Sequence, residues 1–168
     1  MKKTKLLKSV NLDLLCLRVR RIQELLFLLE RNESTFLALW FILFTVVVQF
    51  IIAVSAHRMQ KDYRVGIIDP SLTQESFFFR AHRTFWNSLE NIIPFMGLAF
   101  IALIAGYDAK KLTVITWVYA ITRVFYTITY YMIATEKNPS VRSIFYLIGF
   151  CTTLFMMIDL GWFLITSA

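Results

Sequence analysis

The stretch TFLALWFILFTVVVQFIIAVSA, residues 35–56, contains no charged side chain. A helix of about 20 apolar residues is long enough to cross the roughly 30 Å hydrocarbon core of a bilayer. His57, Arg58 and Lys61 follow and mark a polar end. Lipid offers no water to bond unpaired backbone N–H and C=O groups, and a helix pairs these groups internally. Such a run therefore predicts a transmembrane helix. The chain is therefore interpreted as an integral membrane protein.

Three further segments are predicted to cross the membrane. The second runs from about Gln74 to Tyr107 and joins a polar first half, ESFFFRAHRTFWNSLEN, to an apolar second half. Neither half spans alone, so the polar half must face protein or trapped water. Pro94 lies inside this helix and is expected to kink it. Residues 112–134 and 142–166 form the third and fourth helices, which makes the fold class an all-α, integral membrane four-helix bundle.

The first 34 residues form a basic segment of their own. We expect no cleaved signal peptide, because no small-residue cleavage site follows the opening MKKTKLLK. Leu7, Val10, Leu14 and Leu17 recur at helical spacing among Lys and Arg residues, which indicates an amphipathic helix on the membrane surface. A disordered basic tail and a mitochondrial transit segment stay open as alternatives. The predicted domains are thus an extension, 1–34, and a bundle, 35–168.

Composition limits the classes of function. Hydrophobic residues make up 58% and charged residues 17%, against about half and a quarter in soluble domains. The formal net charge is +7, yet the signatures of RNA-binding modules are missing, so anionic lipid or an acidic ligand is expected and nucleic acid is not. Cys16 and Cys151 lie far apart in the sequence, without a CxxC, HExxH or Walker pattern, so neither a metal site nor a disulfide framework is expected.

Charged residues inside the apolar helices are the candidates for function, because each costs about 2.5–3.5 kcal/mol at the centre of a membrane helix. Arg83, Asn87 and Glu90 follow helical spacing on one face of the second helix. A similar stripe on the third helix consists of Arg123, Thr127 and Tyr130, with Tyr126 beside it. Glu90 and Arg123 are expected to pair inside the bundle, either as a structural ion pair or as part of a site.

The fourth helix opens with Arg142, Ser143 and Tyr146 on one face, as part of a site or as interfacial anchors. Each polar face needs partners for its hydrogen bonds. Together the three faces predict a basic lining near one membrane face, suited to an anionic ligand. His57 and His82 are interpreted as interfacial polar residues.

Three motifs carry a resemblance to a known family. In chain order they are RTFWNSLENIIPF at 83–95, RVFYTITYY at 123–131 and PSVRSIFY at 139–146. With them the chain resembles, over about residues 36–165, the MAPEG family of membrane-associated proteins in eicosanoid and glutathione metabolism. LENIIPF is similar to the microsomal glutathione transferase branch. The resemblance implies a homotrimer with glutathione, as co-substrate, between neighbouring protomers.

The resemblance also implies roles for single residues. Arg142 would hold glutathione as its thiolate, with Ser143 beside it as the second catalytic residue. The positions that match or adjoin family glutathione contacts and signature arginines are Arg58, Arg83, Asn87, Glu90, Arg123, Tyr126, Tyr130 and Tyr146. Trp86 and Tyr126 depart from the prostaglandin synthase branch, which has Arg and His there.

The implied function is a membrane glutathione transferase, also a candidate peroxidase, that acts on apolar electrophiles. The alternative is a non-catalytic, lipid-binding scaffold of the same fold, because a fold does not determine chemistry. A transporter is disfavoured by the lack of an internal repeat. Independently of the family, a homotrimer is predicted because the polar half of the second helix lacks partners within one chain.

The membrane and the orientation stay open. A bacterial inner membrane and the endoplasmic reticulum are not distinguished. The family places the loops after the first and third helices in the cytosol, whereas the count of Lys and Arg on the two sides favours the opposite orientation.

Overall fold

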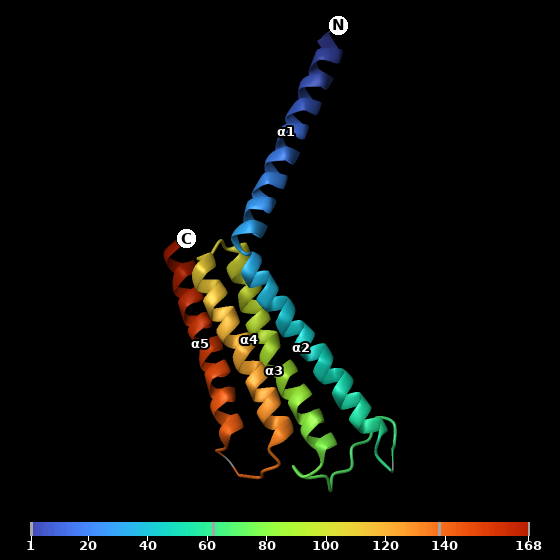
Figure 1. The fold of residues 1–168 in the computed structure, drawn as a ribbon. Coiled ribbons are helices and arrows are strands. Elements are labelled where there is room, and N and C mark those ends of the chain that lie inside the picture. The colour runs from blue at the N-terminus through green and yellow to red at the C-terminus, as the bar shows by residue number, and fades with distance from the viewer. Residues whose placement is uncertain (1, 62, 138, 168) are drawn as a thin grey trace. The chain divides into compact units, whose positions relative to one another are not determined.

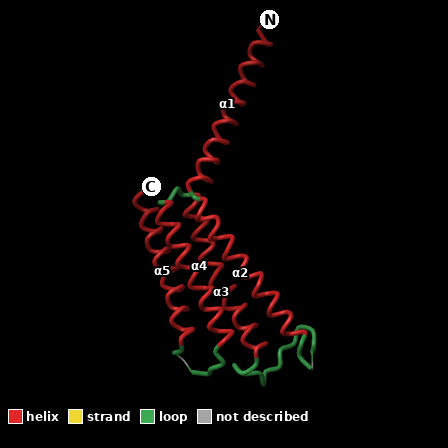
Figure 2. Tube along the Cα trace, viewed as in Figure 1, coloured by secondary structure: helices red, strands yellow, loops and turns green. Residues whose placement is uncertain are grey.

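The computed structural model describes residues 2–61, 63–137 and 139–167, with side chains from residue 17 onward. In that part of the chain every regular element is an α-helix, as Figures 1 and 2 show. The helices are α1 (Lys2–Arg31), α2 (Glu33–Arg58), α3 (Phe77–Ile104), α4 (Ala109–Met132) and α5 (Val141–Ser167).

The chain divides into two compact units, Met1–Glu33 and Ser34–Ala168. The first consists of α1, which is a helix, as the spacing of apolar residues in the N-terminal segment predicts. Asn32 ends it, with its Nδ2 donating 2.9 Å to the carbonyl oxygen of Leu28. The side chains of Leu7, Val10, Leu14 and Cys16 lie outside the described residues. The location of α1 on a membrane surface stays a prediction.

The second unit contains four helices that are long and apolar enough to cross a membrane, α2 to α5. The predicted four-helix membrane bundle and the multi-pass membrane localisation are therefore confirmed. As Figure 1 shows, the α2–α3 and α4–α5 loops lie at one end of this bundle, and the α3–α4 turn lies at the other. The first of these ends carries the polar half of α3.

Two helix boundaries differ from the expected ones because capping residues set them. α3 begins at Phe77, after Gln74, because the Ser76 hydroxyl accepts a bond from the Phe79 amide and caps the helix. α4 begins at Ala109, earlier than expected, because the Asp108 carboxylate accepts 2.7 Å from the Lys111 amide. The predicted kink at Pro94 stays a prediction.

The apolar core lies in the half of the bundle away from the polar part of α3. It contains a stack of Phe95 on Tyr119, whose ring centroids are 3.8 Å apart. Met156 and Leu160 of α5 are buried against it. Lipid tails are as apolar as these side chains, so in a membrane the core stabilises the bundle through close van der Waals packing. With Leu39 and Ile42 of α2, the core therefore joins all four helices of the bundle and leaves the first turns of α3 for other contacts.

Polar side chains fix α2 against α4. Nε2 of Gln49 donates 2.6 Å to Oγ1 of Thr127, and both residues are buried. The hydroxyls of Thr35 and Thr113 share a 2.8 Å bond nearer the other end. Thr127 thus faces α2 and does not join the polar stripe in which the sequence placed it.

An ion pair closes the end of the bundle away from the polar half of α3. Nζ of Lys111 lies 2.7 Å from the Asp159 carboxylate, and the Tyr107 hydroxyl donates to the same group. Lys111 belongs to α4, Asp159 to α5 and Tyr107 to the turn after α3. These three elements are therefore tied together where the apolar core ends.

Candidate functional site

A polar cavity of about 520 Å³ opens where α3 and α5 begin and α4 ends. Its lining residues are Gln74, Arg83, Asn87, Tyr126, Tyr130, Glu136, Arg142, Ser143 and Tyr146. Ligand sites typically enclose about 300–1,000 Å³ and carry a few convergent polar groups. The three polar faces predicted from the sequence thus meet in one cavity, although some of their residues lie elsewhere.

The guanidinium of Arg142 is held by groups of the protein. Its Nη1 donates 3.1 Å to Oε1 of Gln74, and its Nη2 donates 2.8 Å to the carbonyl oxygen of Thr135. Its Cζ lies 4.3 Å above the ring of Tyr130. A guanidinium is always charged and binds both carboxylates and aromatic faces. Arg142 therefore presents a positive charge in the cavity, held by contacts within the protein.

Ser143 takes part in the start of α5. The Ser140 amide donates 3.1 Å to Oγ of Ser143, and the Ser143 amide donates 2.8 Å to the Ser140 carbonyl oxygen. The bond from the Ser140 amide to a side chain three residues later is that of a capping box. It gives Ser143 a defined position next to Arg142 in the cavity wall.

Gln74 and Glu136 are cavity residues that the sequence reasoning missed. Gln74 is only 8% exposed, and its Nε2 donates 3.1 Å to the Tyr130 hydroxyl. Its backbone amide donates 2.9 Å to Oε1 of Glu136. Both residues lie in loops and belong to no helical stripe, so periodicity gave no signal. The available signal for Gln74 was its position two residues before Ser76, which caps α3.

Arg123 lies behind the cavity wall and is only 3% exposed. Its Nη2 donates 2.9 Å to Oδ1 of Asn87 and 3.1 Å to Oγ of Ser88. Its Cζ lies 4.6 Å from the ring centre of Tyr126. Arg123 therefore contacts two residues of the lining, Asn87 and Tyr126, from the protein side.

The predicted pair of Glu90 with Arg123 is wrong. Glu90 is exposed, and the ion pair in the described part of the chain is Lys111 with Asp159. The reason is the helical repeat: Glu90 is about 200° around α3 from Ser88, which faces Arg123. Instead, Nη2 of this buried guanidinium bonds to neutral oxygens, and the group lies against an aromatic face.

Two other predicted positions, Arg58 and Glu90, lie outside the cavity. Arg58 is exposed at the end of α2, and neither it nor Glu90 belongs to the cavity lining. In the described residues, no group of three His, Cys, Asp or Glu side chains could bind a metal ion. The Arg and Glu side chains in the cavity lining are Arg83, Arg142 and Glu136.

The MAPEG family model matches residues 35–162, and the chain belongs to the MAPEG family. This is the family that the three sequence motifs resemble. No curated protein and no solved structure matched the chain. The family places the protein among membrane proteins of glutathione or eicosanoid metabolism, which include glutathione transferases, related enzymes and some non-enzymatic members.

Proposed function

We propose that the protein is a membrane glutathione transferase, closest to the microsomal branch of its family. The observation that carries this proposal is the charge pattern of the cavity. Arg83 and Arg142 supply two guanidinium groups, and Glu136 supplies one carboxylate. Glutathione has two carboxylates, one ammonium group and a thiol, so Arg83 can bind a carboxylate, Glu136 the ammonium group and Arg142 the sulfur. Arg matches carboxylates in geometry as well as in charge.

The reacting group is the thiol, and Arg142 is the residue that activates it in this proposal. A free thiol has a pKa near 8.5, so most of it is protonated at neutral pH. Two unit charges about 4 Å apart attract by about 4 kcal/mol at an effective dielectric of 20. Half of this energy already lowers the thiol pKa by more than one unit. Arg142 therefore favours the thiolate.

The thiolate sulfur then bonds to an electrophilic carbon, and the leaving group departs with the electron pair of the broken bond. With an organic peroxide, the sulfur attacks oxygen instead, and cleavage of the O–O bond releases an alcohol after protonation. A second glutathione reduces the resulting sulfenic acid to glutathione disulfide and water. Both reactions suit apolar substrates that reach the cavity from the bilayer.

A homotrimer belongs to the same proposal. Arg83, Trp86 and Glu90 are all exposed on α3, although α3 is a membrane helix. Polar and charged groups on such a helix require protein or water as partners. A neighbouring copy against this face would cover them and close the open side of the cavity. Native mass spectrometry from detergent tests this, and a dominant monomer or dimer would contradict it.

Thiolate absorbance on adding glutathione to the purified protein tests the activity. We expect a thiolate signal at neutral pH and conjugation of a chloronitrobenzene. Arg142→Ala should shift the signal to higher pH and slow conjugation, whereas the control Lys137→Ala, an exposed residue of the same loop, should not. Superimposable pH curves would remove Arg142 from the mechanism. No thiolate and no turnover in the wild type would favour the non-catalytic scaffold.

A further inference from the structure

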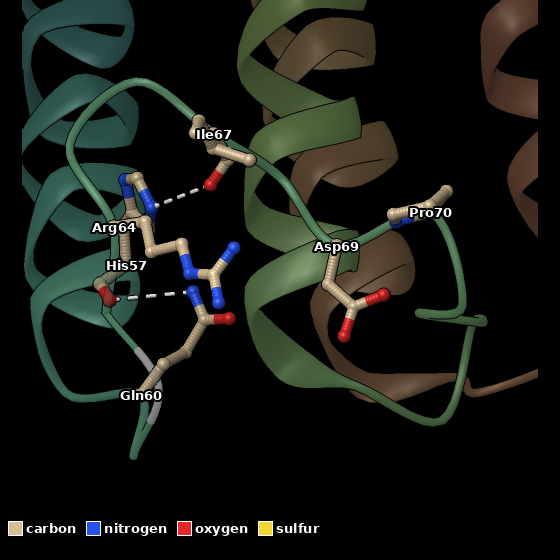
Figure 3. A pocket seen from close by; sticks show the side chains of 6 residues that line it. All are labelled: His57, Gln60, Arg64, Ile67, Asp69 and Pro70. Carbon is tan, nitrogen blue, oxygen red and sulfur yellow. Dashed lines mark hydrogen bonds between the residues drawn. The ribbon is translucent and has the colours of Figure 1, made fainter.

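A second polar pocket, of about 340 Å³, lies in the loop after α2, and Figure 3 shows its lining. The lining residues are His57, Gln60, Arg64, Ile67, Asp69 and Pro70. The loop is held by its own contacts: Nε2 of His57 lies 3.2 Å from the carbonyl oxygen of Ile67, and Nε2 of Gln60 donates 3.3 Å to the His57 carbonyl oxygen. None of these residues lines the glutathione cavity.

Two opposite charges line this pocket without pairing with each other. Figure 3 shows the Arg64 side chain extending toward the part of the loop that carries Asp69. They form no ion pair, since in the described residues only Lys111 and Asp159 do so. Instead the Asp69 carboxylate accepts from the Ser71 hydroxyl at 2.7 Å and from the Ser71 amide at 2.8 Å. These bonds lower the pKa of Asp69, so it is ionised at neutral pH.

An apolar groove of about 490 Å³ adjoins the pocket between α2 and α3. Its lining residues are Ile51, Ile52, Ser55, Ala56, Met59, Gln60, Ser76, Phe77 and Phe78. Gln60 lines both spaces, and the His57 ring stacks on Phe78 at 4.8 Å. The groove follows the last turns of a membrane-spanning helix, and the pocket lies at the polar end of that helix. Apolar and charged surfaces therefore meet at the depth of a lipid headgroup.

We propose that this pocket and groove bind one zwitterionic glycerophospholipid of the bilayer, with the phosphate at Arg64, the amine at Asp69 and an acyl chain along the α2–α3 groove. Arginine binds phosphate oxygens through paired N–H groups, and a carboxylate binds an ammonium group. An anionic lipid without an amine leaves Asp69 unmatched and places a like charge near it. Free glutathione is also a zwitterion, but it has no chain for the groove.

Native mass spectrometry of the full-length protein tests this site, with dioleoyl phosphatidylethanolamine and dioleoyl phosphatidylglycerol added in equal amounts. The wild type should retain phosphatidylethanolamine about tenfold better, the size of one charged hydrogen bond. Asp69→Asn should abolish this preference, and Arg64→Gln should weaken retention of both lipids. Ala56→Phe, which fills the groove and keeps both charges, should also lower retention. Lys61→Gln removes a charge from an exposed residue of the same loop and should change nothing.

Helical content by circular dichroism shows whether each variant folds, so a loss of lipid is attributed to the site only in a folded protein. Equal retention of the two lipids by the wild type would overturn the proposal. So would a preference that survives in Asp69→Asn, or displacement of the lipid by glutathione alone. Because the readout is lipid mass, the result is independent of whether the protein conjugates glutathione.

Discussion

Arg123 on α4 donates a hydrogen bond of 2.9 Å from Nη2 to Oδ1 of Asn87 on α3. A guanidinium has donors and no acceptor, so this contact determines which end of the Asn87 amide faces α4. The Nδ2 donor of Asn87 is left for the cavity that the residue lines. A buried residue behind the wall thus decides that the wall offers a donor to carboxylate or carbonyl groups.

Asn87→Asp tests this relationship at constant size. The carboxylate keeps an acceptor for Arg123, so the unfolding temperature should stay the same or rise. The cavity, however, loses its donor and gains a negative charge, and the dissociation constant of glutathione should increase at least about tenfold. Titration calorimetry measures this affinity. Asn91→Asp makes the same change one turn later, outside the cavity lining, and equal weakening by both variants would contradict the assignment.

Glu90 and Arg123 should behave as independent residues. Arg123→Met leaves Oδ1 of Asn87 and Oγ of Ser88 without their donor, which should cost about 1–3 kcal/mol of unfolding free energy. Glu90→Gln, at an exposed position, should change it by less than about 0.5 kcal/mol without glutathione. The two changes should add to within about 0.5 kcal/mol in denaturant unfolding. A larger coupling energy would restore the ion pair that the sequence suggested.

Gln74 should matter for catalysis although it lies in a loop. Its Oε1 accepts from Arg142 and its Nε2 donates to the Tyr130 hydroxyl. Gln74→Ala removes the hydrogen bonds to Arg142 and Tyr130. Loss of one bond to a charged group is worth about a tenfold change, so kcat/KM for conjugation should fall about tenfold. The adjacent exposed residue provides the control, Glu75→Ala, which should retain the wild-type value. A Gln74 variant with unaltered kcat/KM would show that Arg142 needs no positioning from this loop.

The turn after α3 should make the bundle sensitive to alkali. Burial, followed by the hydrogen bond with Asp159, raises the pKa of Tyr107 from 10.0 to about 12. The fold therefore favours protonated Tyr107, and this stabilisation is complete below about pH 10 and is lost as the pH rises through about 12. As the pH rises through that range, the denaturant midpoint should fall more steeply for the wild type than for Tyr107→Phe. Tyr63→Phe, in the exposed loop after α2, should follow the wild type. Identical slopes for all three proteins would show that Tyr107 is not the source of the alkali sensitivity.

The sequence was informative where a physical rule leaves one solution. An uncharged run such as 35–56 has to cross a bilayer as a helix, and the structure places α2 there. The helical spacing of Arg83 and Asn87 correctly predicted that both belong to one polar face. Helix ends were less predictable, since Ser76 and Asp108 decide them through single capping bonds.

The site was harder to predict because its geometry depends on contacts between helices. Opposite charges suggested a pair of Glu90 and Arg123, but charge does not determine which face of a helix turns inward. The neutral Asn87 and Ser88 accept hydrogen bonds from the arginine instead. Gln74 lies in a loop, and helical spacing in the sequence predicts nothing about which loop residues line a cavity. Lys111 and Asp159 form an ion pair between two helices, and their separation in the sequence could not predict this contact.

The bond between Gln49 and Thr127 has a consequence for how α2 finds its orientation. α2 is apolar around most of its circumference. Its free energy in lipid therefore depends little on its rotation about the helix axis, and hydrophobicity alone does not select one rotation. A buried amide that must find one hydroxyl selects a single rotation, as polar residues do in coiled coils. Gln49→Leu would then leave a folded bundle in which polar bonds fix α2 against α4 only near its start, where Thr35 meets Thr113. Gln49 thus contributes uniqueness of structure more than strength of packing.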